Sequence, residues 1–374
     1  MKKRLVLVGG GHAHMSVLRA LAKKRQKEID VVLITPARHL NYAGMLPGWI
    51  AGHYSQAECR VDLLPLANAA GARLRLDRMV GMDASRRCVR LSNGQHVDYD
   101  LLSLDVGSEI DTSWLELLGN KLLPVKPLDN FFASWPKILA AAKAGKGYKL
   151  LVVGAGAAGV EMALAVQYAF TCAKVDGRVD LVASESGLLP GQAKRVQARV
   201  QILAKHAGLG LHCLRGAGSA EGVLLADGQI LQADHVIAAT GARPPVWLAM
   251  SRLVLDESGY ILVDKHHRSV SHANVFAAGD VCARTDVTLS RSGAHAVHSG
   301  PVLAENLLAV LNGCALQPYR PKRRSLQLLA CGPRHAVASW GRWSAEGQWV
   351  WRWKDWIDRR FIQRFSETPP LRRS

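Results

Sequence analysis

Apolar residues fall in short runs that alternate with amphipathic stretches along the chain. The run LVLV at residues 5–8 is followed by glycines and then by a helical pattern, and LLVV at residues 150–153 repeats this order. Short apolar runs bounded by glycine are typical of strands in parallel sheets. The pattern therefore predicts an α/β fold with two doubly wound, Rossmann-like nucleotide-binding units.

Five features recur in the same order in the two halves of the chain. They are a strand with a glycine loop, a second strand, a Leu-Pro-Gly turn, a hairpin turn and a closing strand that ends in glycine. Asn-Gly and Asp-Gly predict the hairpins because these residues tolerate positive φ. The first copy occupies residues 4–14, 30–35, 44–48, 91–100 and 100–108, and the second occupies 149–159, 179–184, 187–191, 225–234 and 234–242.

The second glycine loop, VVGAGAAGVE, carries the complete GxGxxG fingerprint. Gly154 permits the tight turn, Gly156 lets a pyrophosphate approach the backbone, and Gly159 lets the helix pack on the strand. Free N–H groups and the helix dipole favour an anion there. After the next strand, Glu185 favours NADH over NADPH, whereas Ser184 relaxes that preference.

The first glycine loop, GGGHAHMSVLR, keeps Gly9 and Gly11 but has His14 in place of the third glycine. Either His14 donates to a pyrophosphate, or it fills a wider space between helix and strand with both ring nitrogens satisfied. We favour the second interpretation, because only the helix N-terminus is essential for phosphate binding. His12 lies nearer the loop apex and is the better candidate for contact with a cofactor.

Composition and charge narrow the function classes. No apolar run among the 374 residues approaches the roughly 20 needed to cross a bilayer, and the basic start lacks a secretory signal's apolar length. We therefore expect a cytoplasmic protein. The seven cysteines lack metal or disulfide spacing, so no metal site is expected. Much of the net charge of +18 follows Pro318 and indicates an anionic partner surface.

Two such units followed by VFAAGD resemble the pyridine nucleotide-disulfide oxidoreductase superfamily. GGGHAH, LITPARHLNYAGMLPGWIAGHY and WVWRWKDWIDRRF are similar to a subgroup related to type II NADH dehydrogenases, some members of which are fused to selenophosphate synthetase. Disulfide exchange is not expected, because the chain has no CxxxxC pair. The resemblance implies an FAD domain at residues 1–110 and 244–320, an inserted NAD(P)H domain at 111–243, and a basic, tryptophan-rich segment at 321–374.

The resemblance also assigns cofactor contacts. Asp280 would hold the ribityl-phosphate region, and Gly107 and Gly241 lie in strand ends that resemble the family's ATG motifs. Thr35 replaces the usual acidic residue and can still hydrogen-bond a ribose. The candidate cofactor-binding residues are Gly9, Gly11, His12, Thr35, Pro47, Val80, Gly107, Gly154, Gly156, Gly159, Glu185, Gly241, Gly279, Asp280 and Ala294.

Two residues are candidates for catalysis. Glu161 matches a family glutamate that reaches toward the nicotinamide and the flavin, although a surface-helix glutamate is the alternative. His295 follows Ala294 where type II NADH dehydrogenases have an alanine-glutamine pair at their quinone site, and it could donate a proton or hydrogen bond. The adjacent His266 and His267 are expected to be solvated loop residues.

Six of the ten tryptophans lie between residues 340 and 356. Trp349, Trp351 and Trp353 alternate with other residues, which predicts a strand, and a basic amphipathic helix is predicted from Lys354 onward. Such a helix can attach peripherally to the inner face of the cytoplasmic membrane. Packing against the FAD domain and a homodimer interface remain alternatives, and no nucleic-acid fold accompanies the charge.

These features predict an FAD-dependent NAD(P)H dehydrogenase, with NADH favoured. Hydride would pass from the nicotinamide to flavin N5, and two electrons would then go to a quinone or similar small acceptor. The alternative is a flavoprotein with a regulatory or partner-binding role, linked by the resemblance to selenium metabolism.

Overall fold

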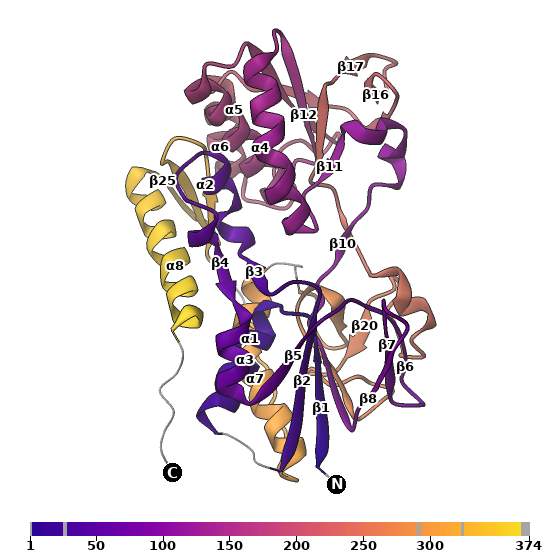
Figure 1. The fold of residues 1–374 in the computed structure, drawn as a ribbon. Coiled ribbons are helices and arrows are strands. Elements are labelled where there is room, and N and C mark those ends of the chain that lie inside the picture. Colours follow the sequence, from indigo (N-terminus) through magenta and orange to yellow (C-terminus); the bar gives the residue numbers. More distant parts are fainter. Residues whose placement is uncertain (1, 25–27, 290–292, 323–324, 368–374) are drawn as a thin grey trace.

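Two parallel five-stranded sheets form the framework of the molecule (Figure 1). The computed structural model describes residues 2–24, 28–289, 293–322 and 325–367. The first sheet has the order β21-β9-β1-β2-β5. Its strands are β1 (Lys3–Val8), β2 (Ile29–Thr35), β5 (Ala72–Leu76), β9 (Leu101–Leu104) and β21 (Val275–Ala277).

The second sheet repeats this plan, with the order β11-β18-β12-β13-β14. In both sheets a central strand, β1 or β12, leads into the glycine loop, and its neighbours run parallel to it. The predicted α/β fold of two Rossmann-like units is confirmed. The strands are β11 (Leu122–Pro124), β12 (Tyr148–Val153), β13 (Gly177–Ala183), β14 (Gly210–Cys213) and β18 (His235–Ala238).

Alternate residues of β1 face two different cores, because successive side chains of a strand point to opposite faces. Leu5 and Leu7 belong to a cluster with the helices, whereas Val6 and Val8 belong to a cluster with the small sheet β6-β7-β8. The helices of the first unit are α1 (His12–Lys23), α3 (Leu63–Ala70) and α7 (Gly293–Leu311), and those of the second are α4 (Leu128–Ala144), α5 (Ala157–Ala173) and α6 (Lys194–His206).

Both predicted hairpins are confirmed. Gly94 and Gly228 take φ values of +82° and +87° at the turns, as the Asn-Gly and Asp-Gly pairs require. The Asn-Gly turn joins β7 (Cys88–Leu91) to β8 (His96–Asp98), and the Asp-Gly turn joins β16 (Gly222–Leu225) to β17 (Ile230–Gln232). β6 (Met79–Asp83) and β15 (Gly216–Gly218) complete the two small sheets.

The chain crosses between the units through a short two-stranded ribbon. β10 (Glu109–Ile110) pairs antiparallel with β19 (Ala242–Arg243). The proposed domain boundaries at 110 and 243 fall in this ribbon and stay a proposal. The remaining short strands are β3 (His39–Asn41), β4 (Arg60–Asp62), β20 (Ile261–Val263) and β22 (Cys282–Arg284).

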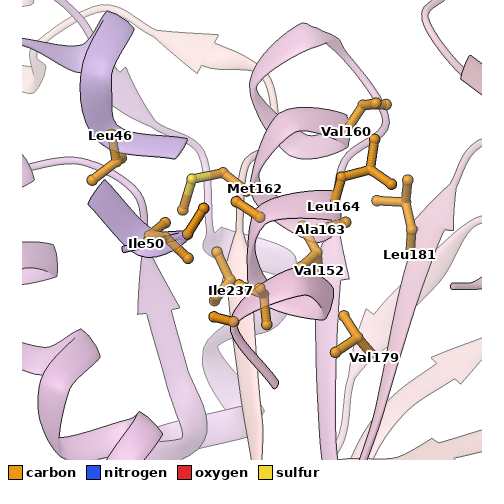
Figure 2. Close-up of a cluster of buried hydrophobic side chains, with 14 of the residues drawn as sticks. Leu46, Ile50, Val152, Val160, Met162, Ala163, Leu164, Val179, Leu181 and Ile237 are labelled. Atoms are coloured by element: carbon orange, nitrogen blue, oxygen red, sulfur yellow. The ribbon is translucent and has the colours of Figure 1, made fainter. Parts of the chain in front are cut away.

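One buried cluster, which includes residues of a short helix, joins the two units. That helix, α2 (Leu46–Ile50), lies where the sequence predicts a Leu-Pro-Gly turn at residues 44–48, so that prediction is wrong. Pro47 fits its first turn, where a missing N–H costs no hydrogen bond. Figure 2 shows Leu46 and Ile50 of α2 packed toward Met162 of α5, within a buried hydrophobic cluster that continues into the second sheet.

The C-terminal part forms a three-stranded sheet and one long helix. The sheet consists of β23 (Gln327–Ala330), β24 (Ala336–Trp340) and β25 (Trp343–Gly347). The strand predicted at residues 349–353 is wrong, because α8 spans Gln348–Ser366. Its buried positions Val350, Lys354, Asp358, Phe361 and Phe365 are three or four residues apart, so helical burial overrides the short tryptophan alternation.

Candidate functional site

The first glycine loop is closed tightly by the end of β9. Gly9 has φ of +96°, and a Cβ there would lie 2.2 Å from the Asp105 carbonyl oxygen. A Cβ on Gly11 would lie 2.4 Å from the Asp105 carboxyl carbon. No side chain fits at either glycine without moving backbone, so both are required by packing against Asp105.

His14 replaces the third glycine as a fully satisfied core residue. The ring is buried, with Nδ1 2.7 Å from the Gly9 carbonyl oxygen and Nε2 2.8 Å from Ser103 Oγ. Since a carbonyl only accepts, Nδ1–H donates to Gly9 and Nε2 accepts from the Ser103 hydroxyl. Burial lowers the pKa of His14 to about 4, so the ring stays neutral. The interpretation that His14 fills the space between helix and strand is confirmed.

We expect His14→Gln to flatten the acid dependence of stability. Because the folded-state pKa of His14 lies below the unfolded value of 6.5, stability is full above pH 6.5 and falls as the pH drops toward 4. One such group contributes up to about 1.4 kcal/mol per pH unit. Urea unfolding at pH 5 and pH 7.5 measures the difference. The exposed His206→Gln on α6 is the control, and equal slopes in His14→Gln and the wild type would contradict the assignment.

The N-terminus of α1 is partly filled by an acidic residue that the sequence interpretation missed. Asp105 Oδ2 accepts the N–H groups of Ala13 and His14 at 2.8 and 3.0 Å. The first four N–H groups of a helix lack partners within it, and those of Gly11 and His12 make no hydrogen bond to the residues that the structure describes, so they are available to a ligand. His12 Nε2 is also buried, without a hydrogen-bond partner among the described residues. These free donors and the glycine cradle fit a dinucleotide phosphate.

Asp280 lies in a polar group beside this helix end. Its Oδ2 is 3.2 Å from Lys126 Nζ and 3.3 Å from Ser108 Oγ. The preceding Gly279 has φ of +73°, and a Cβ there would lie 2.7 Å from Asp105 Oδ1. The second predicted FAD motif, VFAAGD at residues 275–280, therefore lies against the first glycine loop, with Asp105 between them. Lys126 was also missed, because it belongs to no motif and reaches Asp280 from the segment before α4.

The other predicted FAD-side residues are spread around the first unit. Thr35 is buried at the end of β2 and donates to the Ala37 carbonyl oxygen at 3.2 Å. Val80 is half-buried in β6, and Pro47 is buried in α2. Gly107 takes φ of +72° after β9, with open space beside its Cα. The role of these residues in cofactor binding stays a proposal.

The second glycine loop is open at its helix N-terminus. A Cβ on Gly159 would lie 1.7 Å from the Gly154 carbonyl oxygen, whereas no atom of the described residues lies within 4 Å of a Cβ on Gly156 or Gly241. No side chain caps α5 in the described structure. Glu185, after β13, is exposed and forms an ion pair with Arg215 at 3.4 Å. The geometry leaves room for a pyrophosphate over Gly156.

Glu161 lies next to a buried charge cluster on α8 that consists of Lys354 and Asp358. Its Oε1 accepts the Ala330 N–H at 2.7 Å, and burial raises the pKa of its carboxyl to about 7, although Lys354 opposes the shift. Lys354 Nζ donates to the Gly44 carbonyl oxygen and to Asp358 Oδ2, both at 2.6 Å. Lys354 and Asp358 were missed, although their four-residue spacing on the buried face of α8 is a visible signal.

Tyr42 connects the charge cluster to the first glycine loop. Its hydroxyl donates to Asp358 Oδ1 at 3.2 Å, and its ring stacks on Phe361 at 4.5 Å. The His12 ring lies 5.6 Å from the Tyr42 ring, edge to face. The segment after β2, the C-terminal helix and the first glycine loop therefore meet at one place.

His295 lies apart from Glu161, and no interaction joins the two in the described part of the chain. His295 is half-buried near the start of α7 and lines a cavity of about 190 Å³ together with Asp280 and His267. The prediction that His267 is solvated is wrong: it is 3% exposed, and its Nδ1 donates to the Ala277 carbonyl oxygen. Across the ranges that the structure describes, no group of three or more His, Cys, Asp or Glu side chains could hold a metal ion.

Comparison with known proteins identifies the family. The model of the pyridine nucleotide-disulphide oxidoreductases matches residues 3–302, which include both sheets and both glycine loops. The chain belongs to this family. The nitric oxide reductase FlRd-NAD(+) reductase of Aeromonas hydrophila is 30% identical over 377 residues, covering 94% of this chain and 88% of the relative. The chain is therefore an oxidoreductase whose family cofactors are FAD and NAD(P)H.

Solved structures share the fold at low identity. Sulfide:quinone oxidoreductase from Aquifex aeolicus has a TM-score of 0.81 at 15% identity, covering 100% of this chain and 93% of that one. NDH2 from Plasmodium falciparum, in complex with NADH, has a TM-score of 0.80 at 13% identity, covering both chains completely (100%). The chain spans only 39% of another relative, the 24% identical assimilatory nitrate reductase electron transfer subunit of Bacillus subtilis, with 83% of this chain covered.

Proposed function

We propose that this oxidoreductase is an FAD-dependent NADH dehydrogenase that passes two electrons to a quinone or similar small acceptor. The observation that carries the proposal is the pair of glycine loops, one packed against Asp105 and the other open over Gly156. FAD held at the first loop would accept hydride from the nicotinamide and release electrons to the acceptor. Glu185, just after β13, supports NADH rather than NADPH.

The residues of this chain would bind, orient and move protons. The free N–H groups of Gly11 and His12 would hold the FAD diphosphate, and Asp280 would hold the ribityl region with Lys126 beside it. Glu161 supports a proton-transfer role because its carboxyl has a pKa of about 7, which suits exchange near neutral pH. His295, beside Asp280, is proposed as a hydrogen-bond donor to the acceptor.

We expect Glu161→Gln to slow acceptor reduction about 10- to 100-fold while the flavin is still reduced by NADH at nearly the wild-type rate. The two half-reactions are separated by anaerobic mixing with NADH, followed by reoxidation with a quinone series. Glu116→Gln, on the exposed surface of the second unit, is the matched control. Loss of both half-reactions, or of neither, would contradict the proposed role of Glu161.

The exposed tryptophans of the C-terminal part support peripheral contact with a membrane that holds the quinone. Trp340, Trp349 and Trp356 are 53–56% exposed, and Arg360 lies over the Trp356 ring at 5.3 Å. Within the described residues no helix is long and apolar enough to span a bilayer. Trp349→Ala with Trp356→Ala is expected to weaken binding to anionic liposomes, and unchanged binding would exclude this surface.

A redox protein is the other acceptor class, because the relatives include the rubredoxin-NAD(+) reductase of Alcanivorax borkumensis, 26% identical over 360 residues. The alternative to an enzymatic function is a regulatory or partner-binding role linked to selenium metabolism. It would appear as tight FAD binding with negligible turnover on every acceptor. Reoxidation by a quinone but not by rubredoxin would favour the leading proposal.

A further inference from the structure

The two nucleotide-binding units differ at three equivalent positions, and the differences are chemically linked. Gly9 and Gly154 are equivalent because a Cβ on each would strike a strand-end carbonyl, that of Asp105 in one unit and Ala239 in the other. Asp105 therefore takes the place of Ala239. By the same register, His14 takes the place of Gly159 and Ser103 the place of Ile237.

At these three positions the first unit has the polar residues Asp105, His14 and Ser103, whereas the second unit has Ala239, Gly159 and Ile237. Ser103 and His14 satisfy each other and the Gly9 carbonyl, so they are structurally complete. Asp105 is different, because its carboxylate is 4% exposed and forms no ion pair among the described residues. Its hydrogen-bond donors among the described residues are the two backbone N–H groups of Ala13 and His14 on α1. Packing alone does not require an acidic residue at this position, because Ala239 is sufficient at the equivalent position of the second unit.

Asp105 lies where its negative charge would be electrostatically unfavourable next to a bound diphosphate. It lies between Gly11 and Gly279, with carboxyl atoms 2.4 and 2.7 Å from where their Cβ atoms would be. These two glycines belong to the two motifs predicted to hold the FAD diphosphate and ribityl chain. Asp280 is a further carboxylate on the same side, and it has Lys126 as its cation partner at 3.2 Å. Asp105 has no such partner in the described structure.

We propose that Asp105 is a cofactor-positioning residue that becomes protonated when the FAD diphosphate occupies the α1 N-terminus, so that FAD binding takes up one proton from solvent. The inference rests on FAD binding at the first loop and not on the identity of the acceptor. The neutral carboxyl still accepts the N–H groups of Ala13 and His14 through Oδ2. Its new O–H on Oδ1 would face Gly279 and supply a hydrogen-bond donor on that side of the predicted FAD site.

The surrounding titratable groups support Asp105 as the site of proton uptake. They are His12 and His14 on α1, Asp280 after β21 and Lys126 before α4. Burial already raises the pKa of Asp105 to about 6, and a diphosphate would raise it further. His14 has both nitrogens occupied within the protein. His12 is the competing site, because its free Nε2 could take the proton instead.

The test is the pH dependence of FAD dissociation from the full holoenzyme, measured by the fluorescence of released flavin on dilution between pH 6 and pH 8.5. Uptake of one proton gives a dissociation constant that rises up to about tenfold per pH unit. We expect Asp105→Asn to remove this slope and to hold FAD about tenfold more tightly than the wild type at pH 8. His12→Asn is expected to weaken FAD binding uniformly and to keep the slope.

Three results would overturn the proposal: a flat wild-type profile, an unchanged slope in Asp105→Asn, or loss of the slope in His12→Asn. The wild-type profile and the His12 variant decide the matter even where Asp105→Asn does not fold. NADH binding is the internal control and is expected to lack this slope, because Ala239 stands in the second unit. If the purified chain holds no FAD, the proposed function fails; if FAD binds without proton uptake, only this inference fails.

Discussion

Lys354→Met is expected to lower the free energy of unfolding by about 3–5 kcal/mol, because it removes the cation from a buried charge cluster. Lys354 is 8% exposed and Asp358 is 4% exposed, and their 2.6 Å ion pair lies next to Glu161. Without the ammonium, the Tyr42 hydroxyl is the one hydrogen-bond donor left to the Asp358 carboxylate among the described residues, and the Gly44 carbonyl loses the Lys354 donor. Urea unfolding at pH 7.5 measures the loss.

The control for this prediction is Lys143→Met, an exposed position on α4, which is expected to change stability by less than about 0.5 kcal/mol. The double variant Lys354→Met with Asp358→Leu is expected to recover most of the loss, because replacing both partners removes the uncompensated charge. A loss below 1 kcal/mol for Lys354→Met alone, or no recovery in the double variant, would show that the cluster is not the buried ion pair described.

Gly159→Ala is expected to impair NADH use strongly while leaving FAD in place. The new Cβ would lie 1.7 Å from the Gly154 carbonyl oxygen, so α5 must move away from the loop that receives the pyrophosphate. Overpacking of this kind costs about 2–3 kcal/mol, which corresponds to about 30- to 150-fold in the NADH concentration needed for half-maximal flavin reduction. Stopped-flow reduction over a range of NADH concentrations measures the change.

Gly145→Ala is the matched control, since a Cβ at the end of α4 would lie 3.4 Å from its nearest neighbour, which is ordinary contact distance. It is expected to leave the NADH dependence unchanged. The retained flavin in Gly159→Ala checks that the first unit is intact. If Gly159→Ala reduces its flavin with the wild-type NADH dependence, the second loop is not the nicotinamide nucleotide site.

The repeat made much of the fold predictable. A glycine loop after an apolar strand constrains the backbone locally, so the strands that lead into the two loops and both hairpins could be inferred from residue types alone. The helix α8 could not be read from its first half, because the order Trp349, Trp351, Trp353 mimics a strand. What decides its conformation is burial of Val350 and Phe361 against other parts of the chain, which no local pattern contains.

Only those residues of the candidate site that belong to a sequence motif could be predicted. Gly9, Gly11, Gly154 and Gly159 lie as the fingerprint requires, since their neighbours are close in sequence or fixed by the sheet register. Asp105 and Lys126 were missed because each reaches its partners across many residues, whereas the four-residue spacing of Lys354 and Asp358 was a local signal that went unused. Aligning the closing strands of the two units would have revealed Asp105, because the equivalent position of the second unit is Ala239.

Anaerobic titration of the FAD-loaded protein with NADH tests the proposed dehydrogenase function most directly. The oxidised flavin absorbance should disappear with one equivalent of NADH per bound FAD, return on addition of a quinone, and resist reduction in Gly159→Ala at the same NADH concentration. Protein that binds no FAD, or that keeps its flavin oxidised in excess NADH, would contradict the proposed function.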